Sequence, residues 1–165
     1  MTDPNAGPLF DDELEEPPEV VFGGVAEDSD VESGTIYVLR SKSDHPAVEA
    51  NRNLLHKIGV TGGDVQRRLA NAKLDPTFLM AEVETIATYD LYNINRARLE
   101  NLIHRVFAPA RLNIEIKDRF GQPVIPREWF LVPLFVIDEA VERIKDGTIT
   151  GYVYDPGQAK LVRTA

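Results

Sequence analysis

Two short apolar runs, at residues 34–40 and 54–60, constrain the fold of this chain most strongly. Both contain β-branched and large aliphatic side chains, and each has the length of one strand. The stretch between them, residues 41–53, is polar. The pattern therefore predicts two neighbouring strands that are joined by a long loop or a short helix.

Hydrophobic periodicity places further elements along the rest of the chain. The clearest pattern is a helix over residues 95–107, where Leu99, Leu102, Ile103 and Val106 form one apolar stripe. The other predicted elements are a helix over 64–73 that Asp64 begins as N-cap, a strand over 82–89, short strands between 112 and 132, a helix from Pro133 to about Lys145, and a terminal hairpin over 148–163. The predicted fold class is α+β: a small three-stranded antiparallel sheet flanked by helices, with an extra C-terminal helix and hairpin.

Negative charge is concentrated at the N-terminus. Residues 1–33 contain eleven Asp and Glu side chains and no Lys or Arg, so the net charge of −9 becomes +2 when this leader is left out. The leader has too few apolar residues to offset the entropy cost of ordering, and we predict a disordered leader or linker. Two alternatives stay open: a phosphate mimic that competes with DNA for a basic face, and a connection to a larger upstream domain or a partner protein. The mildly basic remainder is compatible with binding a phosphate backbone.

Composition excludes several classes of protein. The chain of 165 residues has no cysteine, which excludes a disulfide scaffold and a cysteine zinc site. No segment approaches the ~18 apolar residues that a membrane span requires, and the N-terminus has neither the basic region nor the apolar stretch of a signal peptide. We therefore expect a soluble, cytoplasmic protein without a membrane partner.

Two polar side chains interrupt the two predicted strands. Tyr37 and Lys57 can share one face of the sheet if these strands pair, because side chains alternate along a strand. A cation within about 4–6 Å of a phenol favours the phenolate, which can accept a proton from water. Gly59 is expected to leave the sheet surface open beside them. An ordinary strand tyrosine and a solvent-facing lysine are the alternative for either residue taken alone.

Two further polar side chains lie at the margins of predicted helices. Arg68 borders the apolar side of the helix over 64–73, whereas Arg67 points away from it. Glu100 lies at the edge of the apolar stripe of the next helix, and His104 follows one turn later. A guanidinium can stabilise negative charge on a phosphate, and one or two carboxylates are the usual protein ligands of Mg²⁺.

The order of these residues resembles the GIY-YIG nuclease superfamily over about residues 34–131. The resemblance rests on a tyrosine in the first strand, on Lys57-Ile58-Gly59 in the second, on the helical arginine and on the glutamate. The Glu100-x-x-x-His104 helix and the later Glu128-Trp129-Phe130 resemble the phage and bacterial variant of that superfamily. Its usual first motif is replaced here by Thr35-Ile36-Tyr37, and the two motifs lie further apart than usual, so the insertion must loop out.

The resemblance implies a divalent-metal-dependent endonuclease that hydrolyses phosphodiester bonds in DNA. It implies that Tyr37 is the general base, that Lys57 assists it and that Arg68 stabilises charge. Glu100 would hold Mg²⁺ or Mn²⁺, and His104 would assist by a hydrogen bond or proton transfer. Four nearby basic residues are candidates for phosphate contacts: Arg111, Lys117, Arg119 and Arg127. 

Two other hypotheses remain open at this stage. One is a catalytically inactive nucleic-acid-binding or interaction module with the same fold, and the other is an RNA-directed nuclease. The predicted domain organisation is the leader over 1–33, the nuclease-like domain over 34–146 and the hairpin extension over 147–165.

Overall fold

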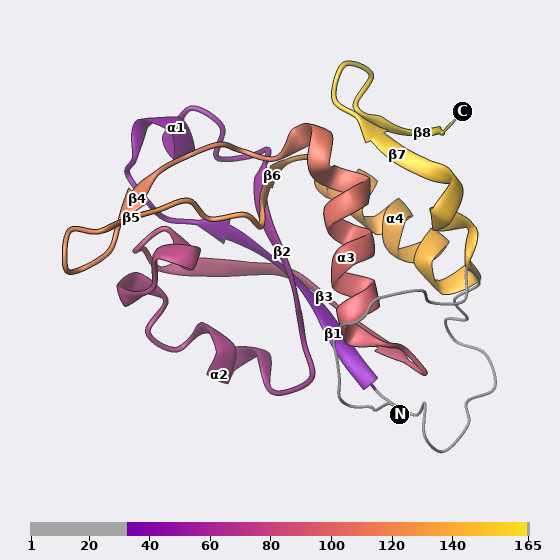
Figure 1. The fold of residues 1–165 in the computed structure, drawn as a ribbon, viewed down its shortest axis with the longest axis horizontal. Coiled ribbons are helices and arrows are strands. Elements are labelled where there is room, and N and C mark those ends of the chain that lie inside the picture. The colour runs from indigo at the N-terminus through magenta and orange to yellow at the C-terminus, as the bar shows by residue number, and fades with distance from the viewer. Residues whose placement is uncertain (1–32, 165) are drawn as a thin grey trace.

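A computed structural model describes residues 33–164 of the chain. Its centre is one antiparallel sheet in the strand order β3-β1-β2-β6 (Figure 1). The strands span Ser33–Ser41 (β1), Leu55–Thr61 (β2), Val83–Tyr92 (β3) and Trp129–Leu131 (β6). The mixed α+β class and the first three strands are confirmed. The acidic leader lies outside the described residues, apart from Ser33.

The prediction of a three-stranded sheet is wrong by one strand. The additional strand, β6, pairs with β2 through the partners Leu55↔Leu131, His56↔Phe130 and Lys57↔Trp129. A short strand in this region was predicted, but its pairing with β2 was not, because no local pattern indicates which strand it joins. The short partner also leaves the end of β2 without a neighbouring strand on that side, beginning at Gly59.

Helices and short hairpins surround the sheet. The α-helices span Pro46–Glu49 (α1), Val65–Leu69 (α2), Arg96–Phe107 (α3) and Leu134–Asp146 (α4). The 3₁₀ turns span Ala72–Leu74, Pro76–Phe78, Ala108–Ala110 and Thr148–Gly151. Two small hairpins pair β4 (Ile116–Lys117) with β5 (Pro123–Val124), and β7 (Tyr152–Asp155) with β8 (Lys160–Arg163).

Most helix predictions are confirmed, but the helix over 64–73 is shorter than expected. Asp64 caps α2 as predicted, since its carboxylate accepts a hydrogen bond from the Gln66 backbone N–H at 3.0 Å. The helix ends at Leu69, because Ala70 is extended and Asn71 adopts the left-handed conformation with φ 66°. Asparagine tolerates this conformation better than most residues, so the chain turns and continues as a 3₁₀ turn.

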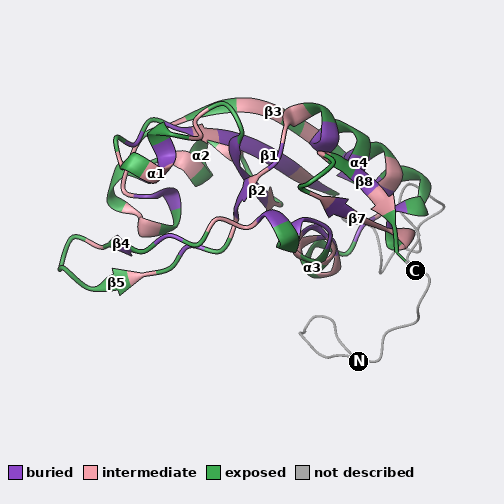
Figure 2. Cartoon of the chain, turned by 90° about the horizontal axis from the view of Figure 1, so that it is seen from above, coloured by how far each residue is buried: buried purple, intermediate pink, exposed green. Residues whose placement is uncertain are grey.

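Both faces of the central strands are buried (Figure 2). On one face Ile36, Val38 and Ile58 join a core with the apolar sides of α3 and α4. The β7–β8 hairpin adds Tyr154 and Leu161 to this same core. On the other face the side chains pack under α2 and the 3₁₀ turns, in a cluster of Tyr37, Leu39, Ala72 and Phe78. No helix among residues 33–164 is long and apolar enough to cross a membrane.

Candidate active site

Strand pairing brings Tyr37 and Lys57 onto the same face of the sheet. Tyr37 lies opposite Gly59, and Leu39 lies opposite Lys57, so all four side-chain positions project the same way. The expectation that Gly59 leaves an open surface is wrong. A Cβ atom at position 59 would collide with the Tyr37 ring, which therefore covers the glycine. Tyr37 and Lys57 are each only 1% exposed.

Lys57 is held by the carboxylate of Glu128, a residue to which the sequence assigns no role. Its Nζ atom lies 2.6 Å from Oε1 of Glu128 and 4.8 Å from the centre of the Phe78 ring. Burial of the ammonium lowers the pKa of Lys57, and the carboxylate of Glu128 opposes that shift. The partner of Lys57 lies 71 positions away in the chain, so no local pattern connects the two residues. The only hint of Glu128 in the sequence is an acidic residue immediately before the apolar run 129–132.

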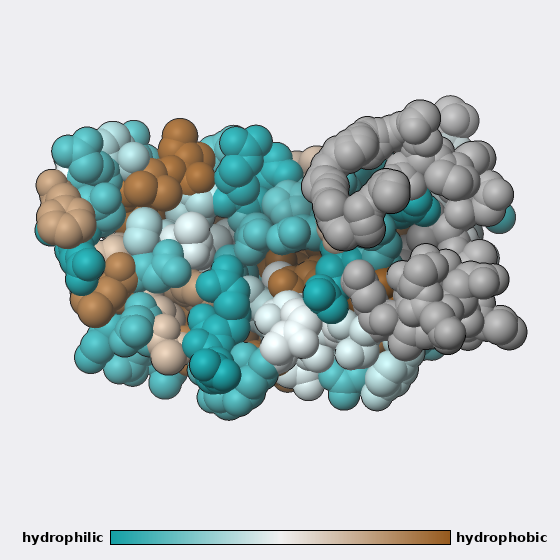
Figure 3. Space-filling view, turned by 60° about the horizontal axis from the view of Figure 1, so that its bottom comes forward, coloured by the Kyte–Doolittle hydropathy of each residue, from teal (hydrophilic) through white to brown (hydrophobic). Residues whose placement is uncertain are grey.

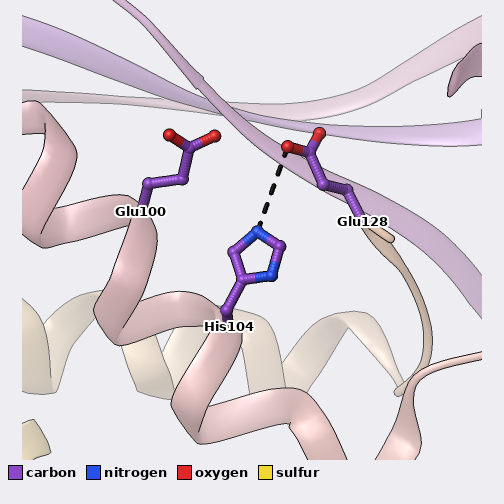
Figure 4. Close-up of side chains that lie close together, drawn as sticks. All are labelled: Glu100, His104 and Glu128. Atoms are coloured by element: carbon purple, nitrogen blue, oxygen red, sulfur yellow. Dashed lines mark ion pairs between the residues drawn. The ribbon is translucent and has the colours of Figure 1, made fainter. Parts of the chain in front are cut away.

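Helix α3 contributes two more groups to the same site. Glu100 and His104 lie one turn apart, and both side chains point toward Glu128 (Figure 4). His104 Nε2 lies 3.9 Å from Glu128 Oε2, and donor atoms of these three residues all lie within 4.8 Å of one another. Glu128 lies directly before β6, and its carbonyl oxygen accepts a hydrogen bond from the Ile58 N–H at 3.1 Å. The site therefore forms at the start of β6, next to the free edge of β2.

The two carboxylates of this site are in direct contact. Burial raises the pKa of Glu100, and the neighbouring charge of Glu128 raises it further. Burial also acts to raise the pKa of Glu128. The positive charge of Lys57, the hydrogen bond that Glu100 donates, and His104 outweigh burial, so the pKa of Glu128 lies below its usual value. The two carboxylates therefore titrate together, and Glu100 is the one that binds a proton more readily. A cation between the two carboxylates would remove the need for that proton.

His104 is oriented by an arginine on the far side of its ring. The NH2 group of Arg111 lies 3.2 Å from His104 Nδ1. A guanidinium can only donate, so Nδ1 accepts and the proton of the neutral ring is on Nε2, facing Glu128. Burial lowers the pKa of His104, which favours this neutral form. The histidine is thus arranged to donate a hydrogen bond from Nε2. The carboxylate oxygens of Glu100 and Glu128 are the ligand atoms that suit a hard cation.

Arg68 approaches Tyr37 from helix α2. Arg67 and Arg68 are both exposed, but the guanidinium of Arg68 lies 5.4 Å from the centre of the Phe78 ring and hydrogen bonds the Tyr37 phenol. This placement agrees with the predicted orientation of Arg68 toward the packed side of the helix. The site thus combines an outward guanidinium with a buried phenol and a buried ammonium.

The expected lowering of the Tyr37 pKa is not observed. Burial raises the pKa of Tyr37 to about 12, and the negative charges of Glu128 and Glu100 add to that effect. Arg68 acts in the opposite direction without reversing the shift. A neighbouring cation alone favours the phenolate, but the desolvation that comes with full burial outweighs it here.

The raised pKa of Tyr37 predicts a loss of stability in alkali. The folded state binds this proton more tightly than the unfolded state, whose tyrosine titrates near pH 10. The contribution of Tyr37 is fully present below pH ~10 and falls by about 2–3 kcal/mol as pH rises to ~12. Urea unfolding at several pH values should show a smaller alkaline loss in Tyr37→Phe than in the unmodified chain. Equal losses in both proteins would contradict the assigned environment.

The four predicted phosphate contacts separate into two pairs. Arg111 and Arg127 lie beside the site: Arg111 Nε donates to the Arg127 carbonyl oxygen at 3.1 Å, and the charges of both residues act on His104. Lys117 and Arg119 lie in the β4–β5 hairpin, which extends away from α3 (Figure 1). Trp129 and Phe130 are fully buried, as expected of core residues.

The T5orf172 domain family matches residues 34–145, which is more than half of the chain and includes every group of the site. The chain belongs to this family. The match overturns the assignment to the GIY-YIG superfamily, which rested on a few short motifs with unusual spacing. T5orf172 domains are associated with nuclease-like and DNA-interacting functions.

A curated relative of this T5orf172 protein is the uncharacterized protein YeeC of Bacillus subtilis (strain 168). The two sequences are 40% identical over 127 residues, which is 74% of this chain and 33% of the relative. The chain thus spans about a third of the relative's length. No solved structure gives a significant match.

Proposed function

We propose that this T5orf172 domain is a divalent-metal-dependent endonuclease that hydrolyses phosphodiester bonds in DNA. The observation that supports the proposal most is the convergence of two touching carboxylates, a guanidinium, a phenol and an imidazole at the free edge of β2. Carboxylates in contact inside a half-buried site are unfavourable unless a proton or a cation lies between them. In a metal-dependent nuclease, such a cation activates the phosphodiester for hydrolysis.

Glu100 and Glu128 are the proposed ligands, with Mg²⁺ or Mn²⁺ as the cation. When bound, the metal would polarise the scissile phosphate and stabilise the departing oxygen. Lys57 contributes by holding Glu128, because its ammonium is buried and already bonded to that carboxylate at 2.6 Å. The Nε2–H of His104 faces the same carboxylate at 3.9 Å and is available to donate a hydrogen bond to a phosphate oxygen bound next to it.

The remaining roles belong to Arg68 and Tyr37. The exposed guanidinium of Arg68 can reach a phosphate in solvent and can stabilise the charge that develops on it. Tyr37 is the proposed general base, and its hydrogen bond from Arg68 favours the phenolate form. Arg111 fixes the tautomer of His104 and is therefore a positioning residue.

One observation favours a second candidate, a DNA-binding module without catalysis. Tyr37 is 1% exposed, and its pKa of about 12 keeps it protonated at neutral pH. A protonated phenol cannot accept a proton from water, so Tyr37 would act as a base only if substrate binding lowered its pKa. The two candidates differ in one observable, the metal-dependent cutting of DNA.

Conversion of supercoiled plasmid to nicked circle, with Mg²⁺ or Mn²⁺ or with chelator, tests the proposal. We expect nicking only with metal, and we expect Arg68→Ala to slow it by about 10²–10³-fold, the loss typical of one preorganised donor. Arg67→Ala is the matched control, because it removes the same charge from the adjacent residue. Equal rates for Arg68→Ala and Arg67→Ala would exclude the assigned role of Arg68, and absence of nicking by the unmodified chain would favour the non-catalytic module.

A further inference from the structure

The β4–β5 hairpin ends in a tip, residues 118–122, that is fastened by four hydrogen bonds. Backbone bonds join Asp118 N–H to the Gln122 carbonyl at 2.9 Å and Gly121 N–H to the Asp118 carbonyl at 3.0 Å. The Asp118 carboxylate also accepts from the backbone N–H groups of Phe120 and Gln122, each at 2.9 Å. Gly121 supplies the left-handed turn with φ 81°. The tip therefore has a defined shape.

This ordered tip presents a large apolar ring to solvent. Phe120 is 75% exposed, and Ile125 on the returning arm is 61% exposed. The guanidinium of Arg119 lies 5.1 Å from the centre of the Phe120 ring. In Figure 3 hydrophobic side chains reach the surface among hydrophilic ones at the end of the molecule that carries the hairpin. A rigid turn that exposes an aromatic ring beside an arginine is suited to contact a partner.

The hairpin is joined firmly to the candidate active site. Ile114 and Ile116 at its base are buried in one cluster with Trp129, the residue after Glu128. Phe120 precedes Glu128 by eight residues, which is at most about 29 Å of extended chain. One turn of duplex DNA spans roughly 34–36 Å. The tip thus lies less than one helical turn of DNA from Glu128.

The free charge near the tip favours a nucleic acid over an acidic or neutral partner. On the hairpin and its return to the site, the cations Lys117, Arg119 and Arg127 outnumber the acidic residues Glu115 and Asp118. The carboxylate of Asp118 is already engaged by two backbone N–H groups, so it offers less repulsion to a phosphate than a free one. Architectural DNA-binding proteins combine cations with an apolar side chain that enters the minor groove.

We propose that the hairpin tip is a DNA wedge, in which Phe120 inserts between base pairs from the minor groove and Arg119 lies in the groove beside it. This inference rests on the proposed function, because the duplex bound by the wedge is the one placed at Glu100 and Glu128. Insertion of an apolar side chain unstacks one base step and bends the duplex. The wedge would thus position and bend the substrate less than one helical turn from the site of cleavage.

The test measures DNA binding and bending in chelator, where cleavage is absent. Fluorescence anisotropy with a duplex of ~30 base pairs gives the affinity, and energy transfer between its labelled ends gives the bend. We expect Phe120→Ala to bind about tenfold more weakly and to lose the bend. Phe120→Trp should retain both. The control is Phe135→Ala, because Phe135 is 65% exposed but lies on α4.

The outcomes separate this inference from the proposed function. Equal affinity and equal bending in Phe120→Ala would overturn the wedge and leave the nuclease proposal intact. If the duplex is not bent by the unmodified chain, then weaker binding by Phe120→Ala would show contact without insertion between base pairs. Binding of a protein partner by the tip instead of DNA would also overturn the wedge. Absence of DNA binding by the unmodified chain would overturn both.

Discussion

Glu100→Ala is expected to lose metal-dependent DNA cleavage by about a thousandfold while duplex binding stays nearly unchanged. The substitution removes one of the two carboxylates proposed to hold the cation, whose charge stabilisation contributes several kcal/mol to catalysis. It removes an acidic group and no cation at the edge of α3, so it does not weaken attraction for phosphate. Single-turnover nicking and fluorescence anisotropy on the same samples measure the two properties.

Glu84→Ala is the matched control for this experiment. Glu84 lies on β3 and is exposed, so the same loss of charge occurs outside the site. We expect the control to cleave at the rate of the unmodified chain. Full cleavage by Glu100→Ala would show that its carboxylate has no part in the reaction.

Glu128→Ala is expected to destabilise the folded state by about 3–5 kcal/mol, the usual cost of breaking a buried ion pair from one side. Lys57 is 1% exposed, and the substitution leaves its ammonium without the carboxylate that lies 2.6 Å away. Replacing both partners, as Lys57→Met with Glu128→Ala, should recover most of the loss because no uncompensated charge remains. Urea unfolding gives the free energies for the four proteins of this double-mutant cycle.

A surface ion pair provides the contrast. Glu139 and Arg143 form an i,i+4 pair at 3.1 Å with side chains that are 44% and 29% exposed. Glu139→Ala should cost less than about 1 kcal/mol, because solvent screens such pairs. A similar small cost for Glu128→Ala would mean that the Lys57–Glu128 pair has no special structural role.

Local patterns in the sequence predicted much of the fold. The apolar stripe of Leu99 and its neighbours gave α3 to within one residue, and Asp64 gave the start of α2. Alternation placed Tyr37 and Lys57 on one face, as the register confirms. These features depend on residues that are near one another in the chain, so a single sequence contains their signal.

Features that depend on distant residues were missed. β6 has only three residues, and its place beside β2 is set by tertiary contacts. Glu128 meets Lys57 across 71 positions, and no periodicity connects the two. The pKa of Tyr37 was predicted in the wrong direction, because burial by α2 and Phe78 is a property of the packed structure. The superfamily assignment failed for a similar reason, since a few short motifs do not represent the whole domain.

The binding of Mn²⁺ together with the cutting of DNA tests the central claim most directly. Paramagnetic resonance counts free Mn²⁺ in a titration of the chain, and plasmid nicking is followed in the same mixtures. The account predicts that the unmodified chain binds Mn²⁺ and nicks plasmid in proportion to the bound metal, and that Glu100→Ala loses both properties. Nicking that continues in chelator, or Mn²⁺ binding and nicking that persist in Glu100→Ala, would contradict it.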